Sequence, residues 1–165
     1  MSDYPLLYID ADSCPRQLRT IILKAVQKRQ ISALFVADRP LNDVIELENS
    51  LGSSLIRMHV VTPGDDSADD YLVQQAQSGT LAITRDIPLA DRLVEKDLTV
   101  IDDRGNVYTK ESVKERLSLR NMMSDLRELG IFVEKTKPMG RKEIKAFSDA
   151  LDRHLTRLIT KQTKQ

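Results

Sequence analysis

Two spacings of apolar residues alternate along this chain of 165 residues. Short runs of adjacent apolar residues, typical of strands buried on both faces, occupy residues 6–9, 33–37, 58–62, 81–84 and 98–101. Between these runs, apolar residues recur every three or four positions, which predicts helices over residues 15–29, 41–50, 66–77 and 89–96. Strands that alternate with helices in this way indicate an α/β fold with a mainly parallel sheet.

The last third of the chain lacks this alternation. After a short extended piece at residues 107–108, the spacing of apolar residues predicts two longer C-terminal helices, over residues 111–129 and 141–159. We therefore expect one domain over residues 1–160, a three-layer sandwich of about five strands with helices on both faces. The helical extension begins at about residue 110, and the polar residues 161–165 are expected to fray.

Aspartates follow three of the predicted strands. Asp10 closes the first strand, Asp66 follows the third, and Asp86 lies two residues after Thr84 at the end of the fourth. Because the carboxyl ends of parallel strands form one edge of a sheet, where ligands bind in such folds, we expect these carboxylates to converge. Asp12 is a weaker candidate, since it could cap the helix that follows it.

An acidic cluster opens the predicted third helix. Asp66, Asp69 and Asp70 stand three and four residues apart, so a helix that begins there carries all three on one face. Capping and the helix dipole would explain one or two of these carboxylates, but not the whole cluster. The cluster therefore adds to the strand-end aspartates as a candidate metal site.

The ligand chemistry favours a hard cation. The candidate ligands are carboxylates without clustered histidine or cysteine, which indicates Mg²⁺ or Mn²⁺ rather than Zn²⁺. Such ions activate water and stabilise the leaving oxygen of a phosphodiester. The candidate metal ligands are Asp10, Asp66, Asp69, Asp70 and Asp86.

Charge is distributed unevenly although the net charge is zero. Residues 1–103 hold 10 Lys and Arg against 17 Asp and Glu, whereas residues 104–165 hold 15 against 8. A basic third beside an acidic metal site suggests a polyanionic partner, although two solvated helices would give the same pattern. Candidate residues for binding substrate phosphates are Thr84, Arg85, Arg104 and Arg120.

Four motifs in order resemble those of the YaiI/YqxD family of bacterial proteins: YIDADSCP at residues 8–15, GDDSADD at 64–70, ITRDIPLA at 83–90 and RGNVYT at 104–109. The resemblance covers nearly the whole chain. It implies a PIN-like fold, a group rich in Mg²⁺- or Mn²⁺-dependent nucleases and related to the 5′-nucleases. By this resemblance, the catalytic residues are Asp10, Asp69 and Asp86, and the substrate is RNA more than DNA.

One position departs from the wider pattern. The 5′-nucleases often place a further aspartate where this chain has Pro88. This departure favours an alternative in which the chain is a non-catalytic, PIN-like nucleic-acid-binding or regulatory protein. A haloacid-dehalogenase-type phosphatase, suggested by Asp10-x-Asp12, is a weaker alternative, because the second predicted strand ends at Asp38 without the required Ser or Thr.

The remaining features indicate an ordinary cytoplasmic protein. No apolar run approaches the ~20 residues of a membrane span, and the first residues do not resemble a signal peptide. The single cysteine, Cys14, excludes an internal disulfide and is interpreted as a small buried residue. His59 and His154 are expected to be structural or solvated. Monomer and homodimer both stay open.

Overall fold

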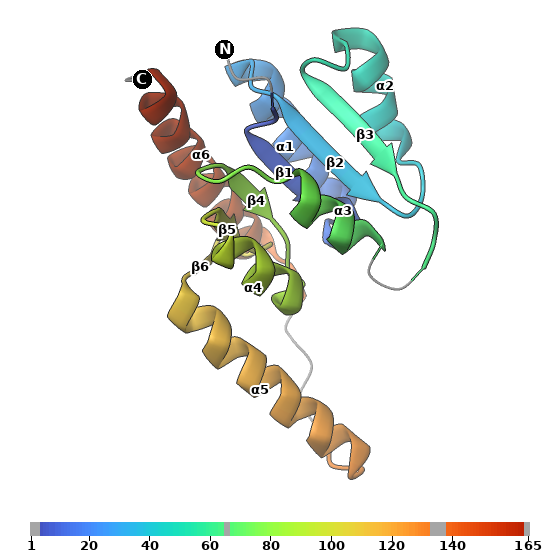
Figure 1. The fold of residues 1–165 in the computed structure, drawn as a ribbon, viewed down its shortest axis with the longest axis vertical. Coiled ribbons are helices and arrows are strands. Elements are labelled where there is room, and N and C mark those ends of the chain that lie inside the picture. Colours follow the sequence, from blue (N-terminus) through green and yellow to red (C-terminus); the bar gives the residue numbers. More distant parts are fainter. Residues whose placement is uncertain (1–3, 65–66, 133–137, 164–165) are drawn as a thin grey trace.

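The computed structural model describes residues 4–64, 67–132 and 138–163. Their order of elements is β1 (Leu7–Asp10), the 3-10 turn η1 (Ala11–Ser13), α1 (Arg16–Arg29), β2 (Ala33–Ala37), α2 (Asn42–Leu51), β3 (Ile56–Val60), α3 (Ser67–Gln75), β4 (Leu81–Ile83), α4 (Ile87–Glu95), β5 (Thr99–Ile101), β6 (Val107–Tyr108), α5 (Lys110–Glu128) and α6 (Arg141–Thr163). These elements confirm the expected α/β architecture (Figure 1).

The sheet has the strand order β3-β2-β1-β4-β5-β6. The first five strands in this order are parallel, and β6 pairs antiparallel with β5. The chain moves outward from β1 to β2 and β3, then returns to the other side of β1 to form β4. The order of the strands therefore reverses between β1 and β4, which is the place where open α/β sheets bind ligands.

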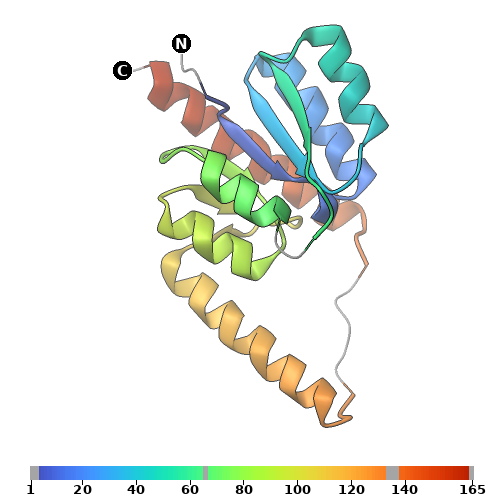
Figure 2. The ribbon, with the colours of Figure 1, turned by 45° about the vertical axis from the view of Figure 1, so that its right-hand side comes forward.

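Alternate residues of the central strands face two separate apolar cores. Leu7 and Ile9 of β1 pack with Phe35 of β2 under α1, α2 and α6, whereas Tyr8 packs with Leu34 under α3 and α4. Figure 2 shows these two sets of helices on opposite sides of the sheet. Both faces of the central strands are buried, which explains their continuous apolar runs.

Two strands differ from the sequence-based expectation. The edge strand β3 spans Ile56–Val60, two residues earlier than predicted, because Ile56 is buried while the polar Arg57 interrupts the apolar run. The extended piece at Val107–Tyr108 is a sixth strand. An edge position tolerates such polar or short strands, since only one side of each must pair.

The last helix also runs further than predicted. It was predicted to end at residue 159, but α6 continues to Thr163, and the fraying expected of the tail stays a prediction. Leu155 and Leu158 anchor its last turns in the core, and Lys161 complements the dipole at its C-terminal end. Residues 164 and 165 lie outside the described residues.

Helix α5 extends away from the rest of the fold (Figure 1). Its first half packs against α4 and β6, and Val113 is buried there. Its second half leads to Ile131 and Phe132, and Phe132 is 87% exposed. In the described ranges, no helix is both long and apolar enough to cross a membrane.

A candidate active site at the carboxyl ends of the strands

Asp10 lies at the centre of the carboxyl edge of the sheet. It is the last residue of β1 and is only 5% exposed. Its Oδ2 atom accepts hydrogen bonds from Thr84 Oγ1 at 2.7 Å and from Ser13 Oγ at 2.9 Å. Oδ1 accepts none from the described residues, so one oxygen of this buried carboxylate is left for a ligand.

Thr84 connects Asp10 to Asp86. The backbone N–H of Asp86 donates to Thr84 Oγ1 at 3.0 Å, and Thr84 in turn donates to Asp10. The carboxylate of Asp86 caps α4, accepting a hydrogen bond from the Leu89 N–H at 3.1 Å. Pro88 occupies the first turn of α4, where its missing N–H has no helical partner to lose. The structure thus brings Asp10, Thr84 and Asp86 together.

The environment of Asp10 disfavours its charge. Burial raises the pKa of Asp10, and the nearby Asp86 carboxylate adds to this rise, while the hydrogen bonds from Thr84 and Ser13 oppose it. A cation beside a carboxylate has the opposite effect, since it stabilises the charged form. The side-chain oxygens gathered here are carboxylate and hydroxyl oxygens, a type of ligand that Mg²⁺ and Mn²⁺ prefer.

The acidic end of β5 was missed by the sequence analysis. Asp102 and Asp103 directly follow β5, so the signal used for the other strands would have found them. Both are buried, and Asp103 Oδ2 lies 3.6 Å from Nη1 of Arg85. Asp103 is therefore a carboxylate at the same edge as Asp10, held next to a candidate phosphate-binding arginine.

Asp102 has a structural role that the sequence did not reveal. Its Oδ1 accepts the N–H groups of Arg104 and Asn106, both at 2.9 Å. Its Oδ2 accepts from Asn106 Nδ2 at 3.1 Å and from Arg116 Nη1 at 3.2 Å. The carboxylate thus shapes the β5–β6 turn. Gly105 in this turn has φ +84°, and a Cβ there would lie 2.5 Å from the Ala146 carbonyl oxygen of α6.

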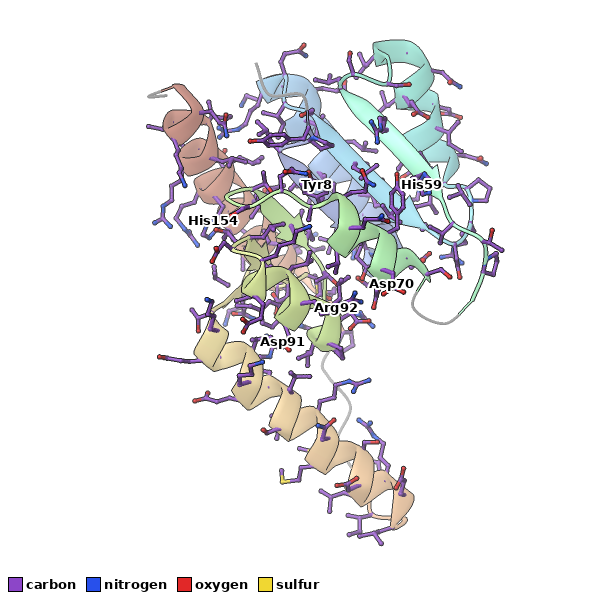
Figure 3. All side chains as sticks on the ribbon, viewed as in Figure 1. Tyr8, His59, Asp70, Asp91, Arg92 and His154 are labelled. Atoms are coloured by element: carbon purple, nitrogen blue, oxygen red, sulfur yellow. The ribbon has the colours of Figure 1, made fainter. Side chains whose placement is uncertain are left out.

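The described members of the acidic cluster, Asp69 and Asp70 of α3, do not complete a direct metal triad. Asp70 Oδ1 accepts from Arg92 Nη1 at 2.9 Å, and the two side chains lie together in Figure 3. Asp69 is half-buried in the first turn of α3, and Asp66 lies outside the described residues. Among the residues that the structure describes, no three His, Cys, Asp or Glu side chains are placed to hold one ion.

Arginines line the cleft beside the carboxylates. A cavity of about 490 Å³ is bordered by Asp103, Arg85, Arg104 and Arg116. A second cavity of about 260 Å³ shares Arg85 and Ile87 with it and is also bordered by Ser13, Asp86 and Arg120. Three of the predicted phosphate-binding residues therefore border these two cavities, whereas Thr84 is buried beneath them and contacts Asp10.

Two of these arginines are fixed by the protein. The guanidinium of Arg116 lies 4.8 Å from the centre of the Tyr108 ring as well as contacting Asp102. Arg104 lies 3.9 Å from a Glu143 carboxylate oxygen of α6. Arg116 was not among the predicted site residues, because only the tertiary structure places it opposite the β5–β6 turn.

Cys14, His59 and the weaker metal candidate Asp12 all make contacts within the protein. Burial raises the pKa of the Cys14 thiol to about 12, which keeps it protonated and unreactive. The His59 ring stacks on Tyr71 with 3.7 Å between ring centres. Asp12 accepts the Asp38 N–H at 3.0 Å and so joins the loops after β1 and β2.

The fold and this site define an α/β protein with a carboxylate and arginine cleft at the switch point of a mainly parallel sheet. The chain matches the family described as "Uncharacterized BCR, YaiI/YqxD family" over residues 8–157, and it belongs to that family. A relative called UPF0178 protein from Syntrophobacter fumaroxidans is 41% identical over 92% of this chain and 94% of its own length. One from Myxococcus xanthus is 42% identical over 96% and 99%. No solved structure matches.

Proposed function

We propose that this protein is a Mg²⁺- or Mn²⁺-dependent nuclease that hydrolyses phosphodiester bonds, with RNA as its main substrate. The observation that carries the proposal is the buried Asp10 carboxylate, joined through Thr84 to Asp86 at the switch point, next to an arginine-lined cleft. Carboxylates for a cation and arginines for phosphates are the two groups that phosphodiester hydrolysis requires. The PIN-like relation expected from the sequence motifs supports the same reaction.

The residues divide into two roles. Asp10 and Asp86 would hold the ion, with contributions from Asp69 in α3, from Asp103 after β5, and from Asp66, which lies outside the described residues. When bound, the cation lowers the pKa of a water molecule and stabilises the leaving oxygen. Mg²⁺ keeps several of its waters, so ligands that reach it through water need not touch it directly.

The basic side chains would bind the substrate backbone. Arg85, Arg104 and Arg120 border the cleft and would contact phosphate oxygens, which orients a strand without reading its sequence. Thr84 would act indirectly, by holding the Asp10 carboxylate in place. The chain has no tryptophan, three phenylalanines and four tyrosines, so an extended base-stacking platform is not part of the proposal.

A cleavage assay tests this function. Mixed RNA substrates incubated with Mn²⁺ and the full chain should be cut, and Asp10→Asn should lower the rate at least ~10³-fold. Asp91→Asn is the matched control, because Asp91 on the neighbouring α4 pairs with Lys114 at 2.7 Å and borders neither of the two cavities. Cleavage by the wild-type protein in excess EDTA would refute the proposal.

The second candidate is a nucleic-acid-binding or regulatory protein without turnover. It is favoured by Pro88 and by the lack of a direct metal triad among the described residues. It predicts RNA binding that persists in EDTA and that Arg120→Gln weakens, with no cleavage under any metal. A DNA substrate in the same assay separates the two nucleic acids. We place either activity in the cytoplasm and propose a monomer or homodimer.

A further inference from the structure

A separate pocket lies at the opposite edge of the sheet from Asp10. It has a volume of about 350 Å³ and is bordered by residues before β4, by residues before β5 and by the second half of α6. The side chains that matter here are His154, Arg157 and Lys161 on α6, and Asp97 on the turn before β5. None of these is part of the cleft described above.

His154 is the least satisfied group in this pocket. It is 9% exposed, and its Nε2 atom is buried without a hydrogen-bond partner in the described part of the chain. Figure 3 shows its place on α6. A buried polar nitrogen without a partner costs free energy, so its presence at a pocket wall indicates a group that the protein itself does not supply.

The charges around His154 indicate that a group bound in this pocket would be an anion. Arg157 and Lys161 make no ion pair with any described residue, and Lys161 Nζ would lie only 3.8 Å from a Cβ built on Gly79. Among the described residues, Asp97 is the one acidic residue that borders the pocket, so cationic side chains outnumber carboxylates there. Burial and the charges of Arg153 and Arg157 lower the pKa of His154, and an anion would reverse this effect.

We propose that this pocket binds a phosphate group, either inorganic phosphate or a phosphate monoester, between His154 Nε2, Arg157 and Lys161. A phosphate dianion offers several acceptor oxygens and makes strong charge-assisted hydrogen bonds with such donors. The pocket volume exceeds what phosphate alone would fill and lies in the range of small-molecule sites, which leaves room for a nucleoside monophosphate. The proposal does not rest on the nuclease activity.

The two histidines of this chain make a direct test possible. The full-length protein, labelled with ¹⁵N at histidine, is titrated with sodium phosphate at constant ionic strength, and His59→Gln assigns the signals. The Nε2 signal of His154 should shift to saturation while that of His59 stays in place. Repeating the titration with a nucleoside monophosphate and with the unphosphorylated nucleoside distinguishes the two phosphate sources, and the nucleoside alone should not bind.

Matched variants separate a site from a general charge effect. Arg157→Gln and Lys161→Gln should each weaken phosphate binding roughly tenfold or more. Arg153→Gln removes the same charge one helical turn away, outside the pocket, and should change affinity by about twofold at most. The proposal is overturned if the His154 signal does not move in the wild-type protein, or if Arg153→Gln weakens binding as much as Arg157→Gln.

Discussion

The two edges of the sheet treat buried polar groups in opposite ways. At the carboxyl edge, Asp10 and Asp102 are buried and accept several hydrogen bonds from neighbouring hydroxyl, amide and guanidinium groups. At the amino edge, His154 Nε2 is buried beside Arg157 and Lys161, and within the described part of the chain it has no hydrogen-bond partner. The difference teaches that the protein itself supplies the partners of its buried charges at the carboxyl edge, whereas the described residues supply none for His154 Nε2 at the amino edge.

Among the variants that test this difference between the two edges, removal of the Thr84 hydroxyl should have the largest effect. Thr84→Val takes one hydrogen bond from Asp10 and leaves the Asp86 N–H without its acceptor. Mn²⁺ affinity, measured by calorimetry, should fall 10–100-fold, as for other residues that orient a ligand. Thr84→Ser keeps the hydroxyl and should restore most of the affinity. Equal Mn²⁺ affinity in Thr84→Val and wild type would show that this network does not serve a metal.

The glycines of the two edges should differ in their tolerance of a side chain. Gly105→Ala places a Cβ against the Ala146 carbonyl as well as straining a positive φ, and should lower the free energy of unfolding by about 2 kcal/mol or more. Gly79 has nearly the same φ, +83°, but only the mobile end of Lys161 nearby, so Gly79→Ala should cost about 1 kcal/mol. Urea denaturation measures both, and equal losses would contradict the close packing of the β5–β6 turn on α6.

Without metal, the charge on Asp10 should destabilise the fold. Its pKa is raised above the ordinary value of 3.8, so the folded protein binds the proton more tightly than the unfolded chain does. Stability is therefore lost as the pH rises from 3.8 through the folded pKa. In EDTA at neutral pH, Asp10→Asn should raise the free energy of unfolding by about 1 kcal/mol.

Asp43→Asn is the control variant for the effect of Asp10→Asn on the free energy of unfolding. Asp43 forms an ion pair with Arg19 at 3.0 Å, so its removal should give no gain in stability. Thermal denaturation of both variants at neutral pH and near pH 4 checks the expected sign. A loss of stability in Asp10→Asn would mean that the hydrogen bonds from Thr84 and Ser13 outweigh the cost of burying the charge.

At the amino edge, the free energy of unfolding should change least with pH, and in the direction opposite to the change expected from Asp10. The pKa of His154 is lowered, so the unfolded chain binds a proton near pH 6.5 more readily than the folded protein. In phosphate-free buffer, wild-type stability should fall by a few tenths of a kcal/mol to about 1 kcal/mol between about pH 7.5 and pH 5.5. The charged groups that face His154 are Arg153, Arg157, Lys161 and Asp97. His154→Gln should remove this slope, and His59→Gln should keep it.

Much of the fold follows from local patterns in the sequence. The apolar runs located β1, β2, β4 and β5, because central strands are buried on both faces and carry little else. The edge strands were harder to predict from the sequence. The polar Arg57 interrupts the apolar run of β3, so its predicted start was two residues too late, and the two residues of β6 are too few to show a period. Helix α6 ran past its predicted end because packing, not polarity, decides where a long helix stops.

The site was predictable in part. Convergence of Asp10 and Asp86 followed from their positions after parallel strands, and Asp103 was open to the same argument. The partners of the charged groups were not predictable, because Arg92 reaches Asp70 and Arg116 reaches Asp102 only across separate helices and turns. Ion-pair partners depend on distances between elements, about which spacing along the chain says nothing.

The sequence by itself therefore determined the positions of the four inner strands, β1, β2, β4 and β5, and of the aspartates that end or follow them. The apolar pattern of a strand and the residue at its carboxyl end both lie within a few adjacent positions, so the sequence alone can reveal them. Only the tertiary structure decided that the switch point falls between β1 and β4. It also decided that the Asp102 carboxylate binds the backbone of the β5–β6 turn, and that His154 is buried beside Arg157 and Lys161. Those outcomes depend on how distant elements pack, which sets burial and distance and hence the chemistry of each charge.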